Sequence, residues 1–270
     1  MNPAVSRLPS LFIGHGNPLT AFDDNQYTRG WAALAAAMPR PRAILCISAH
    51  WYTRGTGVTA MAQPRTVHDF YGFPDALYQY HYRAAGDPAL AQRVAELLAP
   101  LEVIQDQQWG LDHGSWTILK HMYPQADVPV LQLSIDGARD PAWHYELGRQ
   151  LQPLRDEGVL LMGSGNIVHN LRYMLRQLPT TPAYAWAESF YIQVRDGILK
   201  RDHDALIHYE RFGEAAALSV PTPEHFLPLL YVLGASYADE PVTLPLDEVP
   251  LDSISMLSVC CGKLPVVNNA

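Results

Sequence analysis

The stretch Ala43-Ile44-Leu45-Cys46-Ile47-Ser48 is an almost unbroken apolar run that ends in a small polar residue. A short continuous run of this kind is typical of a strand that is buried on both faces of a sheet. Similar runs recur along the chain and predict buried strands at Leu11–Gly14, Ala43–Ser48, Val128–Ser134, Val159–Gly163 and Ile254–Val259.

Amphipathic segments lie between these runs. Asp87-Pro88 and Asp140-Pro141 each place an N-cap acceptor before a proline at the first helical position. Strands that alternate with helices predict an α/β fold, in which helices flank a central, mostly parallel or mixed sheet. The predicted helices are Tyr27–Met38, Asp87–Leu98, Asp140–Arg155, Ala183–Lys200 and Pro223–Leu233.

Composition limits the possible functions. With 19 basic and 27 acidic residues the net charge is −8, which disfavours nucleic acid as a partner. The three cysteines Cys46, Cys260 and Cys261 lack metal-type spacing, and we expect reduced thiols in a reducing compartment. The N-terminus lacks a signal-peptide pattern, and no apolar run approaches the roughly 18 residues of a membrane span. We therefore expect a cytoplasmic protein with no membrane partner.

Three histidines follow predicted strands, where the sites of α/β sheets gather. His15 follows the first strand, His50 the second, and His169 comes shortly after the fourth. Gly14 and Gly16 would let the backbone beside His15 approach a site closely. Each histidine alone could have a structural role, but the matched positions favour a shared metal, and imidazole suits zinc and iron. The pair Gly163 and Gly165 predicts a sharp strand-to-helix turn before His169.

Three other segments are candidates for the same site. In Thr222-Pro223-Glu224-His225, Thr222 could cap a short helix, and either Glu224 or His225 could bind a metal. Neighbours on a helix point about 100° apart, so both binding one ion is disfavoured. The segment Asp112-His113-Gly114-Ser115-Trp116 could place an imidazole over a substrate or simply open a helix. The aromatic loop His68–Pro74 could stack on a ring or pack on itself.

The order of these strings resembles the 4,5-DOPA extradiol dioxygenase family, whose members are class III extradiol enzymes related to the catalytic subunit of protocatechuate 4,5-dioxygenase. The likeness runs from about Leu11 to Val259. It implies a single catalytic domain over residues 1–270. It also implies that both atoms of dioxygen are inserted into a catechol such as DOPA, giving a muconic semialdehyde. The motifs are Gly14-His15-Gly16-Asn17-Pro18, Ser48-Ala49-His50-Trp51, Asp112-His113-Gly114-Ser115-Trp116, Gly165-Asn166-Ile167-Val168-His169-Asn170 and Thr222-Pro223-Glu224-His225.

The resemblance also implies a role for each histidine. His15, His50 and His225 would bind one divalent metal per chain, with His225 preferred over Glu224. His169 would either add a fourth metal bond or act as the catalytic acid and base. His113 would be catalytic and substrate-binding, through a hydrogen bond to substrate or oxygen. Dioxygenase activity would require Fe(II), and Zn(II) would be a plausible metal in purified protein. The substrates would be the catechol and dioxygen, without an obligate protein partner.

Two other functions fit the same residues. A zinc hydrolase would use the imidazoles to activate water, and its activity would survive the exclusion of oxygen. A non-enzymatic binding protein on this scaffold would retain metal poorly and expose a sizeable apolar patch.

Overall fold

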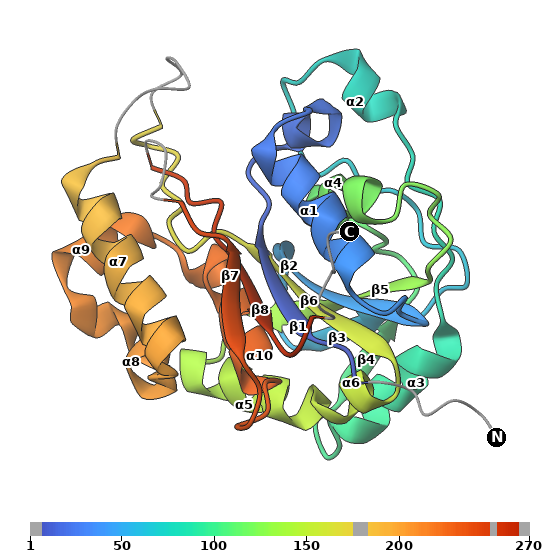
Figure 1. Cartoon of the computed structure of the whole chain (residues 1–270). Helices are drawn as coiled ribbons and strands as arrows, with labels where there is room; N and C mark the ends of the chain where they lie inside the picture. Colours follow the sequence, from blue (N-terminus) through green and yellow to red (C-terminus); the bar gives the residue numbers. More distant parts are fainter. Residues whose placement is uncertain (1–6, 175–182, 249–252, 265–270) are drawn as a thin grey trace, which may run out of the picture.

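An eight-stranded mixed sheet runs through the computed structural model, which describes residues 7–174, 183–248 and 253–264 (Figure 1). The strands lie in the order β4-β3-β5-β2-β6-β1-β8-β7. Their bounds are β1 Ser10–Gly14, β2 Ala43–Thr53, β3 Thr56–Thr59, β4 Val103–Asp106, β5 Val130–Asp136, β6 Val159–Gly165, β7 Val242–Leu246 and β8 Ser258–Cys261.

The central strands β5, β2, β6 and β1 pair in parallel, and antiparallel pairs join β3 to β5, β8 to β1 and β7 to β8. Because the central strands are buried on both faces, their sequences are continuously apolar, and the predicted mixed α/β sheet is confirmed. The strands β3, β4 and β7 were not predicted. Each of them is short, and β4 and β7 are partly exposed and lack an apolar run.

Helices cover both faces of the sheet (Figure 1). The first face packs against α1 and α4, with Trp31 and Trp116 in its core. The opposite face packs against α3, α5, α7 and α10. The helices are α1 Gln26–Ala37, α2 Asp75–Gln79, α3 Pro88–Leu97, α4 His113–Met122, α5 Pro141–Leu151, α6 Pro153–Asp156, α7 Ala185–Lys200, α8 His203–Ile207, α9 Glu214–Ser219 and α10 Leu227–Gly234, with 3-10 turns η1 Pro18–Phe22, η2 Tyr209–Phe212 and η3 Pro223–His225. In the described part of the chain, no helix combines the length and apolar character needed to cross a bilayer.

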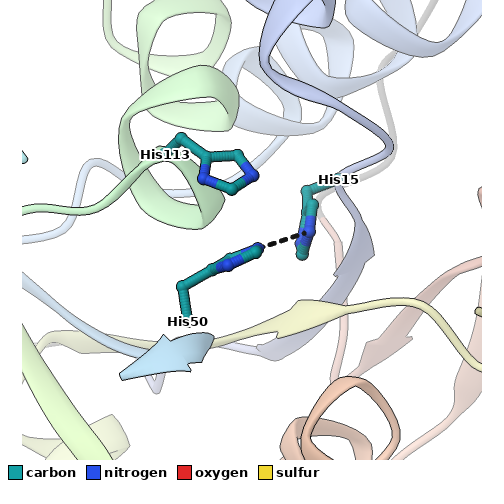
Figure 2. A group of neighbouring side chains, drawn as sticks. All are labelled: His15, His50 and His113. Atoms are coloured by element: carbon teal, nitrogen blue, oxygen red, sulfur yellow. Dashed lines mark hydrogen bonds between the residues drawn. The ribbon is translucent and has the colours of Figure 1, made fainter. Parts of the chain in front are cut away.

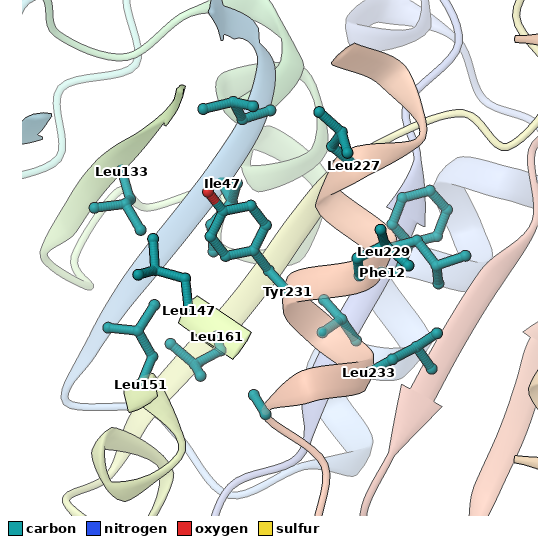
Figure 3. Packing of buried hydrophobic residues seen from close by; sticks show 14 of the residues in the cluster. Phe12, Ile47, Leu133, Leu147, Leu151, Leu161, Leu227, Leu229, Tyr231 and Leu233 are labelled. Atoms are coloured by element: carbon teal, nitrogen blue, oxygen red, sulfur yellow. The ribbon is translucent and has the colours of Figure 1, made fainter. Parts of the chain in front are cut away.

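The helix α10 is apolar on all sides because it lies between the sheet and α5. Figure 3 shows Tyr231 of α10 among Leu147 and Leu151 of α5 and Leu161 of β6. The two helices approach closely at glycines: a Cβ on Gly148 would lie 2.3 Å from the Tyr231 carbonyl oxygen. This packing fixes the start of α10, and with it the η3 turn that comes just before.

Several predicted boundaries were wrong. β2 continues to Thr53, so it contains His50, because after an irregularity its last residues pair again with β5. Only the end of the predicted strand Ile254–Val259 is regular, since Ile254 forms an isolated bridge with His169. The predicted helix Asp140–Arg155 divides into α5 and α6 at Pro153, which cannot donate the next helical hydrogen bond.

The predicted caps had mixed outcomes. Asp87 and Asp140 cap α3 and α5, as expected. Thr222 does not cap η3; its hydroxyl donates to Glu224 at 2.8 Å instead. The predicted helix Pro223–Leu233 is in fact the turn η3 followed by α10.

The cysteines follow the prediction from the sequence. All three are free and buried. Cys260 and Cys261 point into the cores on opposite faces of the sheet, as adjacent strand residues must.

Candidate metal centre

The strand register brings His15 and His50 to one level of the sheet. Ile13 of β1 and Ser48 of β2 both pair with Ser164 of β6, which lies between those strands. His15 and His50 each come two residues later, His15 just beyond the end of β1 and His50 within β2, so both lie at the carboxyl edge of the parallel strands. Figure 2 shows the two rings facing each other, and their Nε2 atoms are 3.1 Å apart.

His113 enters the site from α4 (Figure 2). The preceding Asp112 caps the helix through the Ser115 N–H, and it also accepts a hydrogen bond from the Ser48 hydroxyl at 2.7 Å. The cap therefore ties the start of α4 to β2, and the His113 ring centroid lies 3.8 Å from that of His50. This segment opens a helix, and its imidazole lies at the site; that the imidazole lies over a substrate stays a prediction. Burial, followed by the charge of Asp69, raises the pKa of Asp112 to about 6.

His225 lies on η3, which is anchored at the end of β6. The Asn166 N–H donates to the His225 carbonyl at 2.9 Å, and a Cβ on Gly165 would lie 2.1 Å from that carbonyl oxygen. The His225 ring centroid is 5.5 Å from that of His15 and 5.2 Å from that of His50.

The predicted strand-to-helix turn at Gly163 and Gly165 was wrong. No helix follows β6 within the described residues up to position 174. The two glycines instead allow close packing, because a Cβ on Gly163 would lie 2.5 Å from the Pro228 carbonyl oxygen. By contrast, the expectations for Gly14 and Gly16 are confirmed. Gly14 packs directly against the backbone of Met256, and Gly16 has φ +72.

His169 stacks on His225, with ring centroids 3.5 Å apart and an interplanar angle of 7°. The lone pair of an imidazole nitrogen lies in the plane of its ring. Two stacked rings lie in parallel planes that do not intersect, so their lone pairs point along these separate planes and do not converge. In this arrangement His169 and His225 do not aim at the same ion.

All five imidazoles thus surround one space. The potential ligand atoms of His15, His50 and His113 lie within 4.8 Å of one another. His225 Nε2 is buried and has no hydrogen-bond partner. Such a lone pair is unfavourable unless a ligand satisfies it.

A hydroxyl group assigns the tautomer of His15. Ser164 donates its single hydroxyl hydrogen to the Gly114 carbonyl at 2.5 Å. Its oxygen must therefore accept from His15 Nδ1, at 2.9 Å. It follows that His15 Nε2 carries a free lone pair, directed toward His50.

Carboxylates assign the same tautomer to the other rings. His113 Nδ1 lies 2.8 Å and His50 Nδ1 3.2 Å from Asp69 Oδ2. His225 Nδ1 lies 3.2 Å from Glu224 Oε1. A carboxylate only accepts hydrogen bonds, so Nδ1 of His113 and of His225 carries the hydrogen and Nε2 the lone pair. The close Asp69 carboxylate favours the same tautomer for His50. Glu224, considered as a rival metal ligand, instead orients His225 in this structure.

Four of the imidazoles have pKa values lowered toward the neutral form. Burial, followed by repulsion from neighbouring imidazoles, lowers the pKa of His15 and His50 well below the ordinary value. The same two causes lower the pKa of His169 to about 3. Burial also lowers the pKa of His225, although Glu224 opposes that shift.

These residues fit a divalent metal. Two neutral Nε2 lone pairs at hydrogen-bond distance repel, and either a hydrogen on one of the nitrogens or a cation between them relieves this repulsion. Nitrogens about 2.0–2.1 Å from one ion lie roughly 2.9–3.4 Å apart in octahedral or tetrahedral geometry. The 3.1 Å between His15 Nε2 and His50 Nε2 lies within that range. A carboxylate or hydroxyl behind each ring is the usual support for a metal-binding histidine.

A cavity of about 720 Å³ opens onto the imidazoles. Phe70, on the aromatic loop, lies 5.6 Å from the His113 ring and 5.3 Å from Phe73, measured between centroids. The loop therefore packs on itself and also lines the cavity, whereas its stacking on a substrate ring stays a prediction. Apolar side chains that share the cavity with the histidines are Leu19, Phe70, Phe73, Leu171, Met174 and Ile254.

Two of the residues behind the rings, Asp69 and Ser164, were not predicted as part of the site. Asp69 lies 44 positions from His113, so no local spacing connects them. Ser164 lies 149 positions from His15. The available signals were a carboxylate inside the aromatic loop and a serine between two glycines, and neither one indicates its partner.

Comparison with known proteins gives a consistent result. The family described as "Catalytic LigB subunit of aromatic ring-opening dioxygenase" matches residues 14–256. A protein named 4,5-DOPA dioxygenase extradiol from Escherichia coli (strain K12) is 53% identical over 261 residues, which cover 95% of this chain and 96% of that protein. A protein of the same name from Beta vulgaris is 39% identical, covering 84% of this chain and 86% of that protein. The crystal structure of an uncharacterized protein from Escherichia coli K12 matches with a TM-score of 0.83 and 50% sequence identity. The match covers 95% of this chain and 100% of that chain.

Proposed function

The chain belongs to the family of the catalytic LigB subunit of aromatic ring-opening dioxygenases and is an extradiol dioxygenase; from this premise we propose that it opens a catechol such as DOPA. Both atoms of dioxygen would enter the product, a muconic semialdehyde, and the bond that breaks would lie beside the diol. The substrate is proposed from the names of the relatives. The apolar walls of the 720 Å³ cavity support an aromatic ligand.

The observation that carries this proposal is the convergence of neutral Nε2 lone pairs on one space. We assign His15, His50 and His225 as the ligands of one divalent metal. The buried, unpartnered Nε2 of His225 supports its choice over His113, which lies closer to His50. A bound Fe(II) would supply the positive charge that favours ionised catechol oxygens and the redox chemistry that zinc lacks.

The other two histidines, His169 and His113, would transfer or share protons with the substrate. Because His169 lies parallel to His225, we assign it the acid and base role in preference to a fourth metal bond. Its lowered pKa keeps it neutral before substrate binds, and the negative charge of an ionised catechol would favour its protonated form. We assign His113, through its free Nε2, to accept a hydrogen bond from the substrate.

No further partner is needed for this reaction. The free, buried thiols support the cytoplasmic location expected from the sequence.

Metal replacement tests the proposal. Metal would be removed by a chelator, the protein reloaded anaerobically with Fe(II) or Zn(II), and oxygen consumption measured with DOPA, protocatechuate and 4-methylcatechol. We expect oxygen uptake and a semialdehyde product from the iron form alone. Equal uptake by both forms would contradict the mechanism. Turnover that persists in the zinc form without oxygen would indicate a hydrolase.

A further inference from the structure

Asp69 connects two imidazoles that come from different elements. Its side chain is 13% exposed, within the loop 68–74. Oδ1 accepts the backbone N–H of His113 at 2.9 Å, and Oδ2 lies 2.8 Å from His113 Nδ1. The same Oδ2 is 3.2 Å from Nδ1 of His50 in β2. One carboxylate therefore accepts two hydrogen bonds from His113 and lies within 3.2 Å of a third nitrogen, Nδ1 of His50.

We propose that Asp69 is a positioning residue that holds His113 and His50 as Nδ1–H tautomers with their Nε2 atoms toward the site. This inference rests on the proposed function, in which His50 binds the metal and His113 binds the substrate. Asp69 itself touches neither of these ligands. It acts through the two rings, more strongly on His113, which it contacts twice.

The chemistry of the carboxylate is essential to this role. An asparagine has one acceptor and one donor group at the same positions. If its oxygen faces the two Nδ1 atoms, its NH₂ opposes the His113 backbone N–H. If the amide is reversed, the NH₂ opposes the rings and favours the other tautomer, which removes the Nε2 lone pairs. No orientation of the amide satisfies all three donors.

The position of Asp69 also fixes the cavity wall. Phe70 is the next residue, and its ring lies 5.6 Å from that of His113. The carboxylate that sets the tautomer of His113 therefore also anchors the aromatic loop against it. Metal affinity and substrate orientation should both depend on this one side chain.

A double-mutant cycle with Asp69→Asn and His113→Asn tests the proposal. The amide of His113→Asn can still donate to Asp69, but it lacks Nε2. Zinc affinity would be measured by chelator competition, and kcat and KM by oxygen uptake at saturating Fe(II). We expect Asp69→Asn to weaken zinc binding about 10-fold and to lower kcat about 100-fold. In the His113→Asn background, Asp69→Asn should change kcat less than twofold, because the ring it positions is gone.

The control is Asp75→Asn, an exposed carboxylate at the start of α2, which should match wild type in both measurements. Full recovery of kcat by Asp69→Asn at saturating iron, or additive losses in the cycle, would overturn the proposal. If Asp69→Asn does not fold, Asp69→Glu replaces it in the cycle. It retains an acceptor, so it should weaken zinc binding and kcat less than 10-fold, and equal losses in both backgrounds would count against the proposal. If wild type consumes no oxygen, the proposed function fails, while unchanged zinc affinity in the Asp69 variant would separately reject the positioning role.

Discussion

At the scale of single residues, the chemistry of the site depends on what lies behind each imidazole. A serine hydroxyl faces Nδ1 of His15, Glu224 faces that of His225, and Asp69 faces those of His50 and His113. Each contact leaves Nε2 free to bind a metal or accept a proton. Imidazoles that share one tautomer can therefore have different roles according to their position around the ion.

Alanine variants of His225 and His113 should separate these roles. Removing a metal ligand lowers affinity, whereas removing a substrate contact does not. We expect His225→Ala to lose at least 100-fold in zinc affinity, and His113→Ala to stay within about 10-fold of wild type while losing most of its kcat. Chelator competition and oxygen uptake would measure the two effects. The reverse order of zinc affinities would make His113 the third ligand.

At the scale of elements, a glycine sets the position of His225, one of the proposed metal ligands. The η3 turn rests directly on the end of β6, where the Asn166 N–H binds the His225 carbonyl. The absence of a side chain at Gly165 makes this approach possible. The packing of η3 on the end of β6 thus fixes the distance between His225 and the two histidines that follow or lie in β1 and β2.

Gly165→Ala should therefore impair metal binding without removing a ligand. The new Cβ would lie 2.1 Å from the His225 carbonyl oxygen and would displace η3. We expect at least a 10-fold loss of zinc affinity and about 1–3 kcal/mol of destabilisation, measured by chelator competition and urea unfolding. The control is Gly57→Ala in β3, where the nearest atom would be 3.4 Å away, an ordinary contact. Unchanged zinc affinity in Gly165→Ala would show that η3 can shift without cost.

At the scale of the whole molecule, the fold buries imidazoles in their neutral form beyond the metal site as well. His144 of α5 is 0% exposed, and its Nδ1 lies 2.9 Å from the hydroxyl of Tyr231 on α10. Burial lowers its pKa from 6.5 to about 4. Between these values the unfolded chain binds a proton that the folded chain does not. Stability should therefore fall as the pH falls through this window.

The variant His144→Gln would test this dependence apart from the metal site. For wild type, His144 should contribute a loss of about 2 kcal/mol in the free energy of unfolding between pH 7.5 and pH 5. The uncharged glutamine should remove that contribution and flatten the profile. Urea unfolding of chelator-treated protein at several pH values would measure the slopes. Parallel profiles would mean that His144 is protonated in the folded state.

The sequence by itself determined the central strands, most of the long helices and the histidines of the site. Continuous apolar runs require burial on both faces, and parallel strands bring their carboxyl ends to one edge. His15 and His50 could therefore be predicted to converge. The short strands β3, β4 and β7 escaped prediction because pairing with a neighbour, and not an apolar run, makes them strands.

Only the tertiary structure decided how the histidines are oriented. The stacking of His169 on His225 and the contacts of Asp69 join segments whose sequence separation carries no signal. A residue type states which hydrogen bonds are possible, whereas the tautomer depends on the partner that the fold brings to the ring. For this reason the histidines could be predicted from the sequence as candidate metal ligands. The direction in which each ring points depends on how the fold assembles the sheet, α4 and η3.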